Sequence, residues 1–373
     1  MYISEWIMWL ANLKSDEWVK KNIDEYKGPG RPVIGALYEE TVAEENAFQA
    51  AKRFHRAETR GPIYAFNNTY LEMRCGGLED KRGLVTLISC LALYGVIGMW
   101  ASIGGRILLA AIFDSEVILG RALSIGDYLV FLVGTTMTVT MLWYYSKYAL
   151  WITRMEMLTS RHLLIRFNRV TRQVYLHRPK SCGGIMVLPW EGIASMEVAG
   201  QRLMVGWFPG EVDLPFPTFA FIGKQSSSQA ELQAEWEFIR RYMDEGGLQA
   251  VAKPRTSSLL PLPWNAFSPQ FEALGAFARN GGPLIWLGAL LISPAFVIIG
   301  LSHWASLLLC WRPRWPKIIR EAGKPGKPTP AFTTVADYPP DVQEKLLANA
   351  HRWELRPGRA PDHEHWRRKR NGA

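Results

Sequence analysis

Residues 83–105 read GLVTLISCLALYGVIGMWASIGG, a run of 23 positions without a charged side chain. A helix of about 20 apolar residues is long enough to cross the roughly 30 Å hydrocarbon core of a bilayer. A second uncharged run, YLVFLVGTTMTVTMLWYYS, occupies residues 128–146 and ends in the Trp and Tyr side chains that are typical of a membrane–water boundary. These two runs predict two transmembrane helices within residues 83–151.

A third apolar run, NGGPLIWLGALLISPAFVIIGLSHWASLLLCW, occupies residues 280–311 and contains Pro294. Its 32 residues are long for one span and short for two. It is compatible with a single tilted, kinked helix or with a helical hairpin hinged near Ser293-Pro294. We favour the hairpin, because six basic residues follow this run within 312–327 and such residues prefer the cytoplasm.

Basic residues near the ends of the spans predict the orientation of the chain. The loop 106–127 contains only Arg106 and Arg121, whereas seven basic residues flank the two spans on the other side. They are Arg74, Lys81, Arg82, Lys147, Arg154, Arg161 and Arg166. We therefore predict a multi-pass membrane protein whose N-terminus and whose segment after residue 147 are cytoplasmic.

Residues 160–250 have the alternation and the turn residues of short β-strands. The segment 162–167 alternates, Asn168 begins a turn, and 173–177 returns; further strands are predicted at 184–188, 193–198, 203–208 and 218–222. Ser228 and Glu231 have capping-box spacing and begin a helix. The predicted fold class is α+β: a helical transmembrane anchor with a small antiparallel sheet or barrel capped by a C-terminal helix. Trp190 and Trp236 are expected to anchor that domain.

The stretch LPWEGIASMEV (188–198) and the order of strands before one helix resemble bacterial pleckstrin-homology-like domains, which commonly follow a pair of membrane helices. FNRVTRQVY, LPWEGI and the two preceding spans also resemble proteobacterial membrane proteins encoded beside type VI secretion toxins, where immunity proteins and adaptors are found. These resemblances imply a bacterial inner-membrane protein with a protein partner, namely a cognate toxin or a secretion component.

Six regions follow from these patterns. They are a cytoplasmic helical region (1–82), two transmembrane helices with a short non-cytoplasmic loop (83–151), a cytoplasmic pleckstrin-homology-like domain (152–250), a linker (251–279), a membrane-inserted hairpin or kinked span (280–311), and a basic, partly flexible cytoplasmic tail with a short helix (312–373).

Basic residues are concentrated between positions 161 and 180, where the sequence has no Asp or Glu. Ordinary positive flanking of a span explains part of this charge. Anionic lipid is the further candidate, because each Lys or Arg held near such a surface contributes about 1 kcal/mol. The predicted lipid-facing or partner-binding residues are Arg161, Arg166, Arg169, Arg172, Arg178 and Lys180. Net charge is +9, but no nucleic-acid-binding module is recognisable and no nucleic acid partner is expected.

Catalytic motifs are not found, and no catalytic residue, metal or cofactor is predicted. The cluster Asp362-His363-Glu364-His365 lies in a polar tail, and an ordinary helix histidine is favoured for His303, because no acid shares its run. The expected function is that of a non-enzymatic inner-membrane binding protein, an immunity protein or adaptor for a type VI secretion toxin. The alternatives are an anionic-lipid-sensing scaffold and a membrane enzyme assembled from distant residues, with Asp114, Glu116 and His303 as its candidates.

Overall fold

The structure is a computed structural model, and it describes residues 2–15, 17–18, 57–113, 115–197, 201–209, 212–226, 228–279 and 282–353. The chain forms two compact units. The helical unit comprises residues 78–161 and 260–311, and the sheet unit comprises 2–77, 162–259 and the chain from 312 onward. The sheet unit is therefore built from three separate stretches of sequence, whereas a single contiguous domain at 152–250 is predicted from the sequence.

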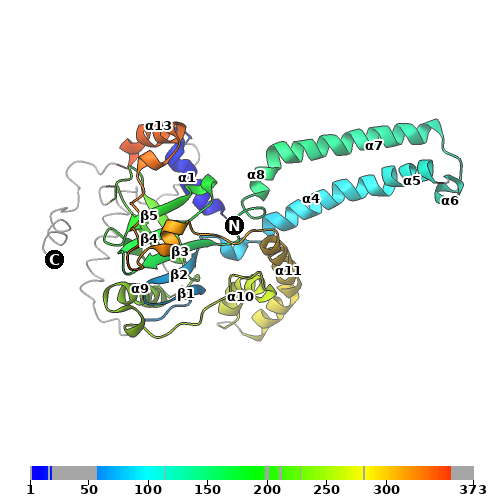
Figure 1. Cartoon of the computed structure of the whole chain (residues 1–373). Helices are drawn as coiled ribbons and strands as arrows, with labels where there is room; N and C mark the ends of the chain where they lie inside the picture. Colours follow the sequence, from blue (N-terminus) through cyan, green and yellow to red (C-terminus); the bar gives the residue numbers. More distant parts are fainter. Residues whose placement is uncertain are drawn as a thin grey trace. The chain divides into compact units, whose positions relative to one another are not determined.

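Two long antiparallel helices make up most of the first part of the helical unit (Figure 1). Their segments are α4 (Leu84–Trp100), the π-helical η3 (Ala101–Gly105) and α5 (Arg106–Ile112), followed by α6 (Ser115–Leu119), α7 (Ile125–Tyr144), the π-helical η4 (Tyr145–Ala149) and α8 (Leu150–Thr153). The indole of Trp100 donates to the hydroxyl of Thr135 at 2.9 Å, which joins the two helices.

The second part of the helical unit pairs α10 (Pro263–Arg279) with α11 (Pro283–Leu308). The two helices are antiparallel, because Phe271 contacts Phe296 at a ring distance of 6.1 Å while Phe267 lies against Gly300. Gly300 permits this close approach, since a Cβ there would lie 2.7 Å from the Phe267 ring.

The predicted hinge at Ser293-Pro294 is wrong, because α11 continues through Pro294. A proline removes one backbone donor and leaves the carbonyl four residues earlier without its usual partner. In α11 that carbonyl belongs to Leu290, and it accepts the hydroxyl of Ser293 at 2.7 Å. The side chain preceding the proline therefore satisfies the acceptor, and the helix is not broken.

Three helices are long and apolar enough to cross a membrane: Leu84–Ile112, Ile125–Thr153 and Trp286–Leu308. Most of their apolar side chains are exposed, as for Leu91, Leu132 and Leu291. The prediction of helices that could cross a membrane is therefore confirmed as far as their length and composition are concerned.

The sheet unit contains an open antiparallel sheet in the order β5-β4-β3-β2-β8-β7-β6. The eighth strand, β1, lies off this path and pairs with β2. Its strands are β1 (Ile63–Phe66), β2 (Tyr70–Cys75), β3 (Leu163–Asn168), β4 (Gln173–His177), β5 (Ile185–Pro189), β6 (Ala194–Met196), β7 (Leu203–Trp207) and β8 (Thr218–Ile222). The predicted α+β class and antiparallel sheet are confirmed. Strands β2 and β8 pair only at Cys75 and Ile222, so the two halves of the sheet are joined at one point.

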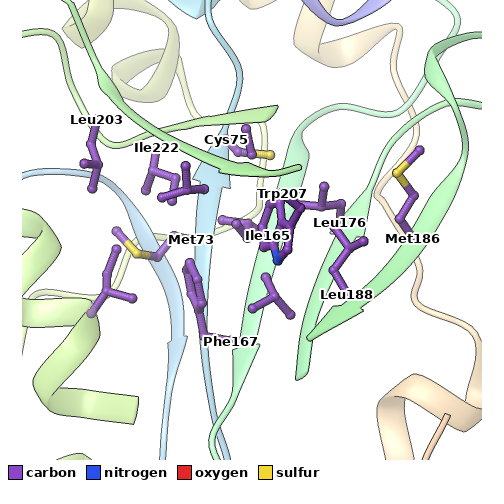
Figure 2. Close-up of a cluster of buried hydrophobic side chains, with 14 of the residues drawn as sticks. Met73, Cys75, Ile165, Phe167, Leu176, Met186, Leu188, Leu203, Trp207 and Ile222 are labelled. Carbon is purple, nitrogen blue, oxygen red and sulfur yellow. The ribbon is translucent and has the colours of Figure 1, made fainter. Parts of the chain in front are cut away.

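A dense apolar core fills the space between these halves. Figure 2 shows Trp207 of β7 among Ile165, Leu176 and Leu188 of the other half, all of them buried. The helices α1 (Ile3–Leu13), α9 (Gln229–Asp244) and α13 (Pro340–Ala348) add Trp9, Trp236 and Leu346 to the same core, among other side chains. Strands and helices distant in sequence thus share one interior.

Strands β1 and β2 precede the first apolar helix in sequence, where a helical region is predicted. Strand β2 lies between β3 and β8, so it is central to the sheet. Leu71, Met73 and Cys75 alternate along it and are buried in the core. Part of the predicted helical region 1–82, residues 19–56, lies outside the described residues.

The opposite face of the sheet is covered by the chain that follows α11. Trp315, Ile319 and Ala322 pack there against three strand residues, Leu164, Tyr175 and Val187. Ile319 belongs to the short helix α12 (Lys317–Glu321). Because successive strand residues point to opposite faces, this second cluster uses the positions between those of the main core.

Candidate functional site

A cluster of buried polar groups lies where the three long helices of the helical unit begin or end. Glu156, just after α8, is fully buried. Its carboxylate accepts the backbone N–H groups of Gly83 and Val85 and the hydroxyl of Thr86 at 2.9 Å. The first N–H groups of a helix have no partner within the helix and favour a negative charge. Glu156 thereby caps α4 from outside that helix.

Arg82 lies two residues before the start of α4 and is also fully buried. Its guanidinium donates to the Ser306 hydroxyl at 3.0 Å, to the Glu156 carbonyl at 3.1 Å and to the Arg161 carbonyl. Glu79 lies 3.5 Å from the same guanidinium and provides a counter-charge. A buried charge is costly unless it is paired and hydrogen-bonded, and these contacts meet that requirement. Arg82 thus links α4, the end of α8 and α11.

His303 of α11 belongs to the same cluster and has no exposed surface. Its Nδ1 lies 3.2 Å from the Gln270 amide, and its Nε2 lies 3.9 Å from a carboxylate oxygen of Glu79. The acid that is missing from the third apolar run is therefore contributed from more than 200 residues earlier in the chain. No local pattern around His303 could have indicated this pairing.

Of the three candidate enzyme residues, the two that the structure describes, Glu116 and His303, are not brought together. Glu116 lies in α6, beyond the far end of the helix Leu84–Ile112, whereas His303 packs against Gly83 at its start. A helix of 29 residues is about 43 Å long. Asp114 lies outside the described residues.

Of the six predicted surface cations, Arg166 lies inside the sheet unit. Its guanidinium makes a two-nitrogen pair with Glu72, at 2.8 and 2.5 Å. The rings of Tyr70 and Trp315 stack against the guanidinium at 4.1 and 4.8 Å, and the Trp315 indole donates to the same Glu72 oxygen. Arg166 is thus paired and covered, which corrects its prediction as a lipid-facing residue.

Two more of these arginines, Arg172 and Arg178, form polar contacts within the sheet unit. Arg172 pairs with Glu191 and Asp244, each at 2.7 Å. Arg178 is buried and donates to the Phe219 carbonyl, so it does not face lipid as predicted. The counter-charges come from other parts of the sequence, which explains why the window 161–180 contains no acid of its own.

The remaining three predicted cations lie in different surroundings. Arg161, in the helical unit, donates to the carbonyls of Leu307 and Cys310 at the end of α11, both at 2.9 Å. Arg169 is half-buried and Lys180 is exposed. The six residues therefore do not share one surface, and contact of the exposed ones with lipid or a partner stays a prediction.

The two predicted anchors, Trp190 and Trp236, lie together in the core of the sheet unit. Both are buried, and their rings are 5.6 Å apart. The Trp190 indole donates to Asp244 at 3.0 Å, so the buried ring keeps a partner for its N–H.

A second buried acid, Glu235 of α9, was not indicated by the sequence. Its carboxylate accepts the Gly61 N–H at 3.2 Å and the Thr59 hydroxyl at 3.4 Å. Burial raises the pKa of Glu235 to about 7, although these hydrogen bonds oppose the shift. Gly223 packs directly against it, because a Cβ there would lie 2.3 Å from the carboxylate oxygens.

Metal chemistry has no candidate site in the described part of the chain, where no three His, Cys, Asp or Glu side chains are grouped to hold an ion. The polar cluster Asp362–His365 lies outside those residues. Comparison of the chain with protein-family models, with curated proteins and with solved structures finds no match.

Proposed function

We propose that this chain is an integral membrane protein that holds a binding module, the sheet unit, at one face of the membrane. One observation supports this most strongly: the three stretches that build the sheet unit alternate with the two stretches that build the helical unit. A single folded sheet has to lie on one side of a bilayer. Each apolar stretch therefore has to leave that side and return to it.

The first apolar stretch, 78–161, meets this condition with two membrane-compatible helices. The second, 260–311, contains only one such helix among its described residues. We propose that α10, 17 residues and so about 25 Å long, enters the membrane with α11 as an antiparallel hairpin. Because α10 ends at Arg279 and α11 begins at Pro283, this hairpin would not be hinged at Pro294 as predicted.

We propose the cytoplasmic face of a bacterial inner membrane as the location of the sheet unit. Arg106 and Arg121 are the basic residues of the loop region, and Arg121 is paired with Asp127 at 2.6 Å. The excess of basic residues on the other side favours a cytoplasmic N-terminus.

Alkaline carbonate extraction of membranes tests the insertion. The full-length chain is expected to stay in the membrane pellet and to enter the supernatant only with detergent. Release by carbonate alone would contradict the proposal.

The finer proposal is that the sheet unit is a pleckstrin-homology-like, non-enzymatic module. The proposal rests on the resemblance of LPWEGIASMEV, whose residues 188–196 run from the end of β5 through β6, and on the presence of α9 after β8 in the sequence. Strand β2 departs from a module contained in one stretch, because it comes from before the membrane helices. Experiments on this module therefore require the full chain.

The proposal of an immunity protein or adaptor for a type VI secretion toxin rests on the two sequence motifs and the chain layout. Co-purification from detergent-solubilised membranes with the product of a neighbouring gene would support it. Cells that lack this protein and remain fully resistant to that toxin would exclude the immunity role.

A further inference from the structure

The chain that leaves α11 forms a narrow basic surface, which we call the basic strap (residues 312–324). Its inner side is apolar: Trp315, Ile319 and Ala322 are buried against the second face of the sheet, and Pro313 is also buried. Its outer side carries five exposed cations, namely Arg312, Arg314, Lys317, Arg320 and Lys324. The packing of the inner side thus holds the cations outward.

These cations differ from the arginines of the β3–β4 hairpin in their surroundings. Arg166 and Arg172 are neutralised by carboxylates from elsewhere in the chain. Among the ion pairs of the described residues, none joins a carboxylate to any of the five outer cations, and the acid of the strap, Glu321, lies 3.8 Å from Lys327. The strap therefore retains a positive charge that the described structure does not use.

The position of the strap in the chain ties it to the membrane. Arg314 is six residues beyond Leu308, the last residue of α11, and a chain spans at most about 3.5 Å per residue. Arg312 and Arg314 are thus within about 20 Å of the end of a membrane-compatible helix. Ile318 of the strap is an exposed apolar side chain (45% exposed), and so is Trp311 (58%), which immediately precedes the strap in the sequence.

We propose that the outer side of the basic strap binds the headgroups of anionic phospholipids and so fixes the orientation of the sheet unit on the membrane. This inference rests on the proposed membrane insertion. Cations next to a membrane helix are attracted by the negative surface of the leaflet, and Trp side chains favour the same boundary. A nucleic acid or an acidic protein would use the same charge, but neither explains the apolar Trp311 and Ile318.

The test uses the full-length chain in lipid nanodiscs made of phosphatidylcholine, with increasing fractions of phosphatidylglycerol. A polarity-sensitive fluorophore is attached at Ile318→Cys in a Cys90→Ser background, because Cys90 is exposed while Cys75, Cys182 and Cys310 are buried. We expect the emission to shift to shorter wavelength as phosphatidylglycerol is added. High salt should reverse the shift, since the attraction is between exposed charges.

The variant Lys317→Glu/Arg320→Glu reverses two outer cations. It should need about tenfold more phosphatidylglycerol, or more, to reach half of the shift. The matched control Lys14→Glu/Lys345→Glu makes the same change in net charge at two other exposed lysines of the sheet unit. Its titration should stay within about twofold of the unchanged protein. Equal thermal unfolding midpoints would show that both variants are folded.

Three results would overturn the proposal: no shift with phosphatidylglycerol, an equal loss in strap variant and control, or the same shift with soluble glycerol phosphate, inorganic phosphate or an oligonucleotide in pure phosphatidylcholine discs. Failure of the proposed function is separate, because it would appear as release of the chain by carbonate.

Discussion

At the scale of single residues, several arginines of this chain are paired with acids that lie far away in the sequence. The run of basic residues between 161 and 180 looks like a surface for an anionic partner when only its own neighbours are considered. In the structure, Glu72 neutralises Arg166, and Asp244 and Glu191 neutralise Arg172. A sequence window contains the charge but not the partner, so neither the pairing of Arg166 nor that of Arg172 could be predicted from it.

The buried pair of Arg166 and Glu72 predicts an asymmetric effect of mutation. Glu72→Gln leaves the guanidinium buried without its counter-charge and should lower the free energy of unfolding by about 3 kcal/mol. The double variant Glu72→Leu/Arg166→Leu removes both charges and should cost clearly less. Thermal or denaturant unfolding of the full-length protein in detergent measures both. Equal losses in the single and double variants would show that the pair does not behave as a buried ion pair.

Glu235 predicts a pH dependence of stability. The pKa of its carboxyl is about 7 in the folded protein, against an ordinary value of 4.5. Between these values the unfolded chain loses its proton first, so the free energy of unfolding should fall as pH rises from about 4.5 to 7 and then stay level. Below pH 4.5 both states are protonated, so the slope vanishes and the free energy of unfolding is at its highest for this group.

Glu235→Gln should remove that slope, because it retains an acceptor for the Gly61 N–H but does not ionise. At pH 8 it should raise the free energy of unfolding by up to about 3 kcal/mol, and at pH 4 by very little. The measurement is the difference between the two stability curves across this range. A difference independent of pH would contradict the assigned cause.

At the scale of elements, the local sequence pattern was sufficient to predict the six strands β3 to β8, because the alternation and the turn residues lie within each segment. Asn168 illustrates the point: its side-chain oxygen accepts the N–H groups of Val170 and Thr171 and begins the predicted turn. The pattern of β2 was equally visible in Leu71, Met73 and Cys75. Its place between β3 and β8 was not, since pairing between strands so far apart in the sequence has no local signal.

The polar cluster of the helical unit was missed for the same reason. Arg82, Glu156 and His303 lie far apart in the sequence, and each has an ordinary local explanation. The favoured hinge in the third apolar run was wrong for a different reason: Pro294 predicts a break only if the Leu290 carbonyl stays unsatisfied, and Ser293 satisfies it.

The α10–α11 pair gives a prediction with a control on the same helix. Gly300→Val places side-chain atoms where Phe267 packs and should separate the helices, lowering the thermal unfolding midpoint by several degrees. Gly288→Val introduces the same residue where no atom lies within 4 Å of the new Cβ, so its midpoint should change little. The account of this packing fails if both variants unfold alike.

At the scale of the whole molecule, the order of the segments along the chain constrains the membrane topology more than any motif does. The sheet unit is interrupted twice by apolar stretches, so neither it nor the helical unit is encoded in one piece. Composition alone indicates a membrane protein. The condition that both apolar stretches return to one side follows only from knowing which segments fold together.

The most direct test of this claim is the labelling of single cysteines with a membrane-impermeant thiol reagent. Ser15→Cys, Ser181→Cys and Ala348→Cys place one exposed thiol in each of the three stretches of the sheet unit, and Ala122→Cys places one in the loop between the first two long helices. In a Cys90→Ser background, the account predicts that the first three react only after the membrane is opened and that Ala122→Cys reacts in intact cells. Labelling of any one of the three in intact cells, or protection of Ala122→Cys, would contradict it.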